Sequence, residues 1–254
     1  LVAGEQADDA IEVASRLADD GFWTALEYTA TPAPQGAFAE AAAQAYETLV
    51  DAIAGTDLTA STEVVVLPEA LGVWAADGAR ARLAALAALA ADRGVGFFLG
   101  FGPSADAEAN LDLAQGLWAD GLDVGLTLPA SWRRTEAECA RLGARRIRLV
   151  KGSAGGRGPT THHQPIEIDK AFVRCARRLV AGPGSASFAT HDPRIIGIVE
   201  DLLTRAGRPR STYEFTFFMG RQTGEQNRLA QAGERVLVYV PYGPQWFERL
   251  VAGL

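Results

Sequence analysis

The sequence predicts an α/β fold, a single (β/α)8 barrel of the TIM type that spans residues 1–254. Short runs of β-branched, aromatic and leucine residues alternate with longer segments of helical periodicity, as in a parallel sheet with crossover helices. Eight such units fit within 254 residues, whereas a doubly wound sheet more often has about five to seven strands. Several runs are almost continuously apolar, which is typical of strands that are buried on both faces.

Each predicted strand is a short apolar run, of which Val64-Val65-Val66-Leu67 is the clearest. The eight are Phe22–Tyr28, Glu63–Leu67, Val95–Phe101, Asp123–Leu128, Arg145–Val150, Ala186–Thr190, Tyr213–Phe218 and Val236–Val240. Amphipathic segments long enough to cross back over the sheet are Phe38–Ala54, Gly78–Asp92, Ala105–Ala119, Thr135–Leu142, Asp169–Val180 and Pro193–Ala206. The segment Ile11–Leu17 predicts one extra helix before the first strand.

Two local patterns predict where helices begin. Thr135 is followed by Glu138, which is the spacing of a capping box. Asp192 is followed by Pro193, and this pair places a capping carboxylate before a proline suited to the first helical turn. Both patterns predict a helix start shortly after a strand.

Composition excludes several classes of function. A net charge of −7 and a pI near 5.1 disfavour nucleic-acid binding, which requires clustered Lys and Arg. No apolar run reaches the roughly 18–20 residues of a membrane helix, so we expect no stable membrane insertion. Cys139 and Cys175 lie in helical patterns and indicate neither a disulfide framework nor a thiolate metal site. These features predict a cytoplasmic protein.

Functional groups of a barrel lie at the carboxyl ends of its strands, so the strand-to-helix junctions are the candidate site. These junctions contain Glu69, residues 100–103, 129–132, 151–156, 191–192, 219–221 and 242–243.

Motifs at several of these junctions resemble one known family. The fifth strand reads Arg148-Leu149-Val150-Lys151-Gly152, the sixth Phe188-Ala189-Thr190-His191-Asp192, and the eighth Val238-Tyr239-Val240-Pro241-Tyr242-Gly243. Further similar stretches are Ala3-Gly4-Glu5, Leu26-Glu27-Tyr28, Val124-Gly125, Arg133-Arg134-Thr135 and Tyr213-Glu214-Phe215. In this order and register the chain resembles the flavin-dependent proline dehydrogenases from Ala3 to about Phe247.

The resemblance implies a non-covalent FAD at the top of the barrel, whose N5 takes a hydride from the carbon beside the substrate nitrogen. It assigns Arg148 to the flavin N5 and O4 edge, where a cation stabilises the reduced ring, and Tyr239 to the substrate, and both are the predicted catalytic residues. The predicted cofactor-binding residues are Arg148, Lys151, Gly152, Ala189, Thr190, His191, Asp192 and Thr216, and the predicted substrate-binding residues are Tyr239, Phe218 and Tyr242.

Departures from the family pattern concern the groups that bind proline. The family clamps the substrate carboxylate with a Lys at the end of the second strand and an Arg pair in the last helix. Here Val66, Leu67 and Pro68 end the second strand. Counted without gaps from Tyr239, the Arg positions fall at Ala252 and Gly253, although a slipped alignment could recruit Arg249. We therefore expect poor binding of free L-proline.

Other family positions also differ. Gly100 and Gly102 replace acidic residues, Pro129 and Thr216 replace glutamines, and Asp192 stands where the family usually has Asn. An apolar rim of Val66, Leu67, Phe217, Phe218 and Tyr242 is predicted to favour a substrate whose carboxylate is absent or masked.

Three remaining features have both structural and functional readings. Glu214 requires a buried partner, which Arg148 or Lys151 could provide. Trp132 follows the fourth strand and could serve packing or cofactor stacking. Adjacent His162 and His163 seldom chelate a metal together, so no metal site is predicted.

The leading hypothesis is an FAD-dependent oxidoreductase that oxidises a C–N bond of a proline-like amine. Its partners would be a small-molecule amine and an electron acceptor, either a quinone or oxygen. The alternative is a diverged barrel without flavin redox activity, which acts as a binding protein or in a different reaction. Gly100, Pro129 and Thr216 favour this alternative.

Overall fold

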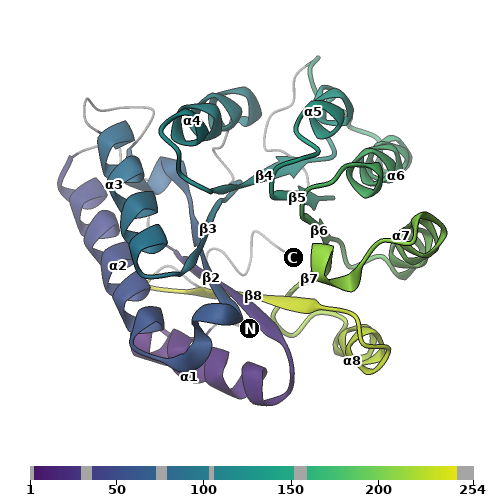
Figure 1. The fold of residues 1–254 in the computed structure, drawn as a ribbon. Helices are drawn as coiled ribbons and strands as arrows, with labels where there is room; N and C mark the ends of the chain where they lie inside the picture. Colours follow the sequence, from purple (N-terminus) through teal and green to yellow (C-terminus); the bar gives the residue numbers. More distant parts are fainter. Residues whose placement is uncertain (1–2, 30–35, 73–78, 103–105, 152–158, 245–254) are drawn as a thin grey trace.

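A computed structural model describes residues 3–29, 36–72, 79–102, 106–151 and 159–244. Its strands form a closed, all-parallel barrel in the order β1 to β8, with β1 paired to β8 (Figure 1). The strands are β1 Trp23–Tyr28, β2 Thr62–Val66, β3 Gly96–Leu99, β4 Gly125–Pro129, β5 Ile147–Val150, β6 Ala186–Ala189, β7 Tyr213–Phe218 and β8 Val236–Tyr242. The predicted (β/α)8 barrel is confirmed.

Helices cover the outside of this barrel (Figure 1). They are α1 Ala7–Asp19, α2 Gly36–Ala54, α3 Ala79–Asp92, α4 Ala107–Ala119, α5 Thr135–Arg141, α6 Pro165–Ala181, α7 Pro193–Ala206 and α8 Thr223–Gln231. Short 3-10 helices lie at Asp57–Ala60 (η1), Pro68–Leu71 (η2) and Arg210–Thr212 (η3). As predicted, α1 precedes the first strand, and it packs against both β1 and β8 where the barrel closes.

Side chains alternate between two cores. The larger core lies between the strands and the helices and includes Val64, Val66 and Phe217. The smaller core fills the barrel interior with Ala25, Val65, Phe98 and Leu237, against which Trp23 and Tyr239 pack. Because residues two apart on a strand share a face, this division determines which side chains can reach a site inside the barrel.

Helix starts agree with one of the two sequence patterns. Asp192 caps α7 by accepting a hydrogen bond from the Arg194 backbone nitrogen at 3.0 Å, and Pro193 is the first helical residue, as predicted. The capping box at Thr135 is wrong, because Thr135 lies inside the first turn of α5 and its hydroxyl donates to the Pro129 carbonyl at 2.6 Å. Glu138 instead forms ion pairs with Arg134 and Arg141.

Two of the differences between the predicted and the observed elements have a clear local cause. The helix α6 begins at Pro165 rather than Asp169, because a proline at the first helical position has its backbone angle preset for the helix. The short, polar helix α8 was not predicted, since its nine residues carry few apolar side chains and so little periodicity.

Candidate active site

Several of the residues predicted to bind the cofactor or the substrate meet near the carboxyl ends of β5, β6, β7 and β8, which we call the mouth. Lys151 follows β5, Thr190 and His191 follow β6, and Tyr239 lies in β8. Contacts link them around the barrel, from Lys151 to Asp192, from His191 to Phe218 and from Phe218 to Tyr239. Strand order alone explains this meeting, because parallel strands place all their carboxyl ends at one edge.

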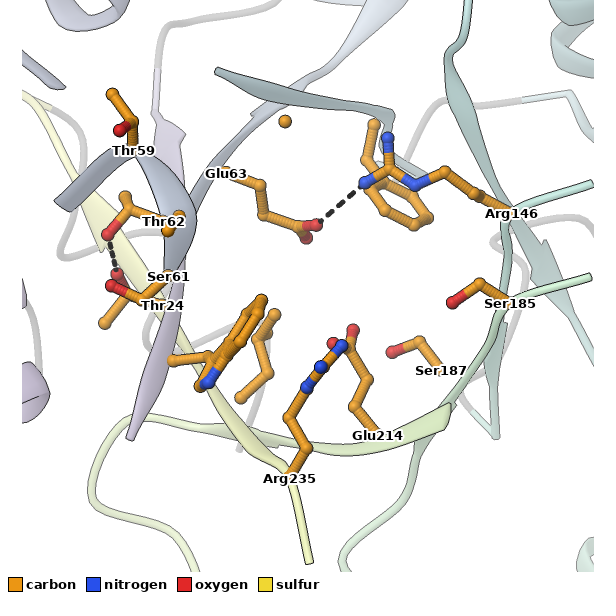
Figure 2. Close-up of a pocket in the computed structure, with 15 residues that line it drawn as sticks. Thr24, Thr59, Ser61, Thr62, Glu63, Arg146, Ser185, Ser187, Glu214 and Arg235 are labelled. Carbon is orange, nitrogen blue, oxygen red and sulfur yellow. Dashed lines mark hydrogen bonds and ion pairs between the residues drawn. The ribbon is translucent and has the colours of Figure 1, made fainter. Parts of the chain in front are cut away.

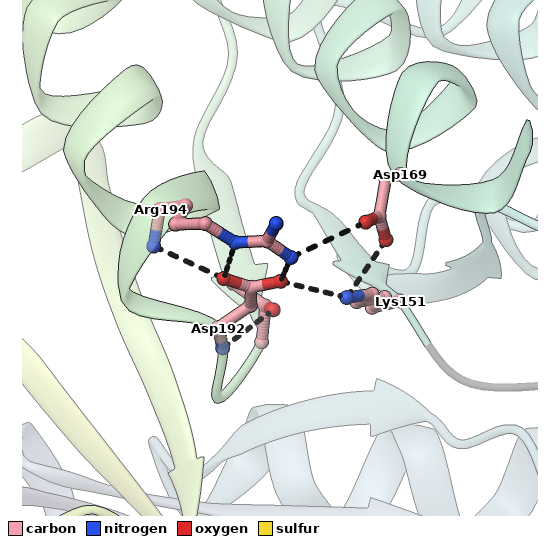
Figure 3. Close-up of polar contacts among 5 residues, drawn as sticks. Lys151, Asp169, Asp192 and Arg194 are labelled. Atoms are coloured by element: carbon pink, nitrogen blue, oxygen red, sulfur yellow. Dashed lines mark hydrogen bonds and ion pairs between the residues drawn. The ribbon is translucent and has the colours of Figure 1, made fainter. Parts of the chain in front are cut away.

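Four charged side chains form the polar part of the mouth, and we call them the mouth quartet: Lys151, Asp169, Asp192 and Arg194. Figure 3 shows them around the Asp192 carboxylate. The Lys151 Nζ lies 2.7 Å from Asp169 and 3.1 Å from Asp192. Arg194 Nη2 lies 2.8 Å from Asp192 and 3.7 Å from Asp169. Two cations therefore face two carboxylates, and the quartet has no net charge.

These contacts set the protonation states of the mouth quartet. Hydrogen bonds from Arg194, and then from Lys151, hold the pKa of Asp192 well below its ordinary value. Burial would lower the pKa of Lys151, but its hydrogen bonds to Asp169 and Asp192 outweigh burial and raise it. At neutral pH Asp192 and Lys151 are both charged, and each lies within ion-pair distance of a group of opposite charge.

An aromatic wall continues the mouth beyond the mouth quartet. The Phe218 and Tyr239 rings meet edge to face with centroids 5.1 Å apart, and His191 packs on Phe218 at 5.7 Å. Phe218 is 44% exposed, so its ring presents an apolar surface to solvent. The Tyr239 hydroxyl donates a hydrogen bond to Glu27, a fully buried carboxylate on β1.

His191 fixes the turn after β6. Its Nε2 accepts a hydrogen bond from the Phe218 backbone nitrogen at 3.1 Å, which ties β6 to β7 at the mouth. Burial, assisted by the nearby Arg221 cation, lowers the pKa of His191. The imidazole is therefore neutral at neutral pH, as an acceptor at Nε2 requires. Thr190 contributes to the same turn by accepting from the Asp192 backbone nitrogen at 3.2 Å.

Arg148 lies inside the barrel, where its side chain is only 2% exposed. Its guanidinium bonds to Glu63 on β2, to Glu214 on β7 at 3.3 Å and to Ser187 on β6 at 3.1 Å. It also stacks over the Phe98 ring at 4.2 Å. The predicted partnership of Glu214 with Arg148 is thus the observed one, and we call Glu63, Arg148 and Glu214 the interior triad.

Burial and charge oppose each other in the interior triad. Burial would lower the pKa of Arg148, but Glu63 and Glu214 outweigh it and raise that pKa. Burial also raises the pKa of Glu63, against the opposing effect of Arg148. One donor of the guanidinium, Nη1, is buried and has no hydrogen-bond acceptor among the described residues.

Several predicted residues lie outside this pattern of mouth contacts. Thr216 is buried inside the barrel and shares a 2.6 Å hydrogen bond with Ser187. Ala189 accepts from the Lys151 backbone nitrogen as part of the sheet, at 3.1 Å. Tyr242 is buried and packs on Tyr28 with ring centroids 5.4 Å apart, in the core outside the barrel. Gly152 and the Gly-rich stretch after it lie outside the described residues.

The predicted apolar rim is wrong for four of its five members, because Val66, Leu67, Phe217 and Tyr242 are all buried. Val66 and Phe217 are each 1% exposed and belong to the core between strands and helices. Their neighbours Val65 and Phe218 occupy the inward positions, so the alternation of the strands turns Val66 and Phe217 away from the mouth. Leu67 is also buried, which leaves Phe218 as the exposed apolar member of that rim.

Three important residues were missed by sequence reasoning: Glu63, Asp169 and Arg194. Glu63 was placed in a strand, but its partner Arg148 lies 85 residues away. Asp169 lies at the start of a predicted helical segment, and no sequence pattern singles out Arg194. A buried acidic residue inside an apolar run was the one available signal, and it marks Glu63 as needing a cation.

The His162-His163 pair and Trp132 are the remaining sequence features with two possible readings. Within the described ranges, no three or more His, Cys, Asp and Glu side chains are arranged to hold a metal ion. The His162 Nδ1 lies 3.8 Å from a carboxylate oxygen of Glu167. Trp132 is buried, and the Arg134 guanidinium stacks over its ring. In the described part of the chain, no helix has the length and apolar content needed to cross a bilayer.

Comparison with known proteins identifies relatives of one kind. A family model described as proline dehydrogenase matches residues 10–246. Proline dehydrogenase 1 of Bacillus subtilis is 23% identical over 249 residues, which cover 97% of this chain and 82% of that protein. The proline dehydrogenase of Deinococcus radiodurans is 31% identical over 101 residues, or 40% of this chain and 33% of that protein.

Solved structures show the same fold. Proline utilization A of Bdellovibrio bacteriovorus, inactivated by N-propargylglycine, superposes with a TM-score of 0.83 at 18% identity. The corresponding protein of Bradyrhizobium japonicum gives a TM-score of 0.74 at 19% identity. This chain is covered to 96% and 95%, but it spans only 30% and 28% of those longer chains.

Proposed function

This chain belongs to the proline dehydrogenase family, and we propose that it is an FAD-dependent oxidoreductase that oxidises a C–N bond of a proline-like amine. When bound, FAD supplies N5 as the hydride acceptor. We further propose that the substrate is not free L-proline. The electron acceptor would be a quinone or oxygen, and the reaction would take place in the cytoplasm.

The single observation that best supports a flavin is the unfilled hydrogen-bonding capacity of Arg148. This cation is 2% exposed, yet its Nη1 has no acceptor among the described residues. A buried donor without a partner is costly, by about 1–3 kcal/mol or more when charged. Tyr239 is near enough to influence the pKa of Arg148. An electron-poor ring with acceptor atoms, held above Arg148, would use this donor.

The aromatic wall suits the ring of a flavin. Phe218 offers an exposed apolar face, and His191 and Tyr239 fix that face from either side. Thr190 and the neutral His191 would border the ring with hydroxyl and imidazole groups. The side chains present at the mouth therefore fit a flavin ring.

The mouth quartet would hold the diphosphate less firmly than a typical phosphate site. Lys151 and Arg194 are the cations there, and Asp169 and Asp192 already neutralise both. Phosphate binding benefits most from uncompensated Arg or Lys. This neutrality is the specific observation that favours the second candidate function, a diverged barrel without flavin redox activity.

Buried carboxylates at the same end of the barrel support an amine substrate. Glu27 is 0% exposed and accepts from Tyr239, and Glu69 is 6% exposed beside Gly102. Negative charges disfavour a second carboxylate placed among them and favour a cation. A protonated amine without a free carboxylate would therefore bind, whereas the carboxylate of L-proline would be repelled.

Flavin content and substrate preference test this proposal separately. The purified protein, or the protein reconstituted with FAD, should show the visible absorption bands of a bound flavin. Under anaerobic conditions, stopped-flow mixing with L-proline should reduce that flavin far more slowly than mixing with pyrrolidine or a prolyl ester. A colourless protein that cannot be reconstituted would support the non-flavin alternative. Fast reduction by L-proline would instead retain the flavin and reject the proposed substrate class.

A further inference from the structure

A cavity of about 170 Å³ lies at the amino end of the barrel, opposite the mouth. Its walls include Trp23, Thr62 and Gly96, which are the first residues of β1, β2 and β3. Solvent reaches it past Ala60 and Ser185, which are exposed. The volume equals that of roughly six water molecules at about 30 Å³ each, so the cavity accepts only a small molecule.

Charged side chains point into this amino-end cavity from several strands (Figure 2). Glu63 and Arg146 face each other from opposite walls with 3.6 Å between their nearest charged atoms. Glu214 and Arg235 enter from the β7 and β8 side. A cavity lined by four ionisable side chains differs from the apolar voids that imperfect packing leaves.

Both carboxylates of the cavity are already engaged. Glu63 pairs with Arg148 as well as Arg146, and Glu214 pairs with Arg148 at 3.3 Å. The Glu63 side chain is 10% exposed and the Glu214 side chain 12%. Arg146 and Arg148 therefore engage both carboxylates of the cavity lining, and Arg146 also lies 4.0 Å from Asp123. Arg235, the other guanidinium in the lining, is left without either carboxylate.

Arg235 is the cavity cation whose contacts differ from those of the others. Its guanidinium stacks on the Trp23 ring with the central carbon 3.9 Å from the ring centroid. Among the residues that the structure describes, no carboxylate lies within ion-pair distance of it. Stacking on indole fixes the plane of the guanidinium and leaves its edge donors in the plane available to a ligand.

We propose that the amino-end cavity binds a small oxyanion, a carboxylate or phosphate group, through Arg235. The fixed plane of Arg235 would donate two parallel hydrogen bonds to the two oxygens of one oxyanion, as guanidinium groups commonly do. Arg146 would add positive potential from the facing wall. The cavity volume excludes nucleotides and FAD, so this site is separate from the proposed flavin site at the mouth, although Glu63 and Glu214 connect the two through Arg148.

A purely structural role would also explain buried charges at this end of a barrel, where residues commonly serve stability. Arg235 distinguishes the two explanations, because a stabilising arginine is expected to pair with one of the carboxylates nearby. Instead it remains stacked on Trp23 without an acidic partner in the described residues. Binding measurements with probe anions can decide between them.

The test uses Trp23 as the reporter in the 254-residue chain. Acetate and inorganic phosphate are titrated at constant ionic strength while tryptophan emission is recorded, with ethylammonium chloride as the cationic probe of similar size. We expect saturable changes with at least one anion and none with ethylammonium. Trp23→Phe should abolish the emission change, and Arg235→Gln should weaken binding by at least about tenfold, since a charge-assisted contact is lost.

Matched variants keep the result interpretable. Arg205→Gln removes an exposed arginine that pairs with Asp201 within α7, and it should leave anion binding unchanged. Glu214→Gln removes one negative charge from the cavity and should tighten binding, which decides the matter if Arg235→Gln fails to fold by circular dichroism. Binding of acetate alone would identify a carboxylate site, and binding of phosphate alone a phosphate site. Absence of saturation with both anions, or equal affinity in Arg235→Gln, would overturn the proposal.

Discussion

The interior triad and the mouth quartet are both networks of ion pairs, but their surroundings differ. Side-chain exposure in the interior triad is 2% for Arg148, 10% for Glu63 and 12% for Glu214. In the mouth quartet it ranges from 14% for Asp192 to 80% for Arg194. Water therefore screens the charges of the mouth quartet much more strongly than those of the interior triad. The same chemical pairing is therefore structural inside the barrel and adjustable at the mouth.

The difference also appears in the direction of the pKa shifts. Inside the barrel, burial dominates and raises the pKa of Glu63. At the mouth, hydrogen bonds from Arg194 and Lys151 dominate and lower the pKa of Asp192. Two carboxylates with guanidinium partners thus shift in opposite directions, because desolvation is large in one region and small in the other.

Removal of the interior cation should have the largest effect. Arg148→Ala leaves Glu63 and Glu214 buried without their partner, which typically destabilises a protein by about 3–5 kcal/mol. If the proposed flavin role holds, flavin reduction should also slow by about 10²-fold or more. Urea unfolding and stopped-flow reduction measure the two effects. Arg205→Ala, at an exposed pair on α7, is the control and should change the unfolding free energy little. An equal loss in both variants would contradict the contrast between the two networks.

Steric crowding beside Arg148 should have the next largest effect. A methyl group added at Gly125 would lie 2.4–2.5 Å from three atoms of the Phe98 ring, which stacks beneath Arg148. Gly125→Ala should therefore destabilise the barrel by about 1–3 kcal/mol, as overpacking does. The matched control is Gly197→Ala on α7, where nothing lies within 4 Å and helix propensity predicts a gain of about 0.5–1 kcal/mol. Thermal unfolding of both variants would reveal whether the two substitutions change the stability in opposite directions.

The raised pKa of Glu63 and the lowered pKa of Asp192 predict opposite dependences of stability on pH. A raised pKa means that folded Glu63 holds its proton more tightly than the unfolded chain does. Its contribution to stability is complete below the ordinary pKa of 4.5 and declines as pH rises through the raised pKa. Glu63→Gln should abolish this decline. Urea unfolding at a series of pH values, compared as wild type minus variant, should give a difference that falls with rising pH.

The smallest effect on stability is expected at Asp192. Its lowered pKa gives a contribution that is present above the ordinary pKa of 3.8 and is lost as pH falls toward the lowered pKa. Asp192→Asn should remove that acid-side loss while keeping the helix cap, since Asn caps as well as Asp. The wild type minus variant difference should therefore rise with pH, opposite in sign to that of Glu63→Gln.

The same variant sharpens the proposal on the diphosphate. Asp192→Asn leaves the mouth quartet with a net positive charge and should tighten FAD binding by about fivefold, which corresponds to roughly 1 kcal/mol at 4 Å in water. Flavin fluorescence titration measures this change, and Asp201→Asn on α7 is the matched control. Unchanged FAD affinity in Asp192→Asn would exclude the mouth quartet from the diphosphate site.

Much of the fold was determined by local sequence patterns. The bounds of β7 and α7 agree with the prediction to the residue, because Tyr213–Phe218 is a compact apolar run and Asp192-Pro193 fixes a helix start. The family motifs also located Lys151, Thr190, His191 and Tyr239 at one end of the barrel. These features depend on neighbours within a few positions, where propensity, capping and periodicity act.

Tertiary structure alone decided which charges meet. Glu63 and Arg148 are 85 residues apart in sequence. Trp23 begins β1 and Arg235 directly precedes β8, and these two strands become neighbours when the barrel closes. Lys151 is neutralised because α6 and α7 bring Asp169 and Asp192 to the same point. Electrostatic energies depend on distance in space and on burial, and a linear sequence specifies neither. The sequence thus determined the barrel and its family, whereas closure of the barrel determined which charges became the buried triad, the neutral quartet and the amino-end cavity.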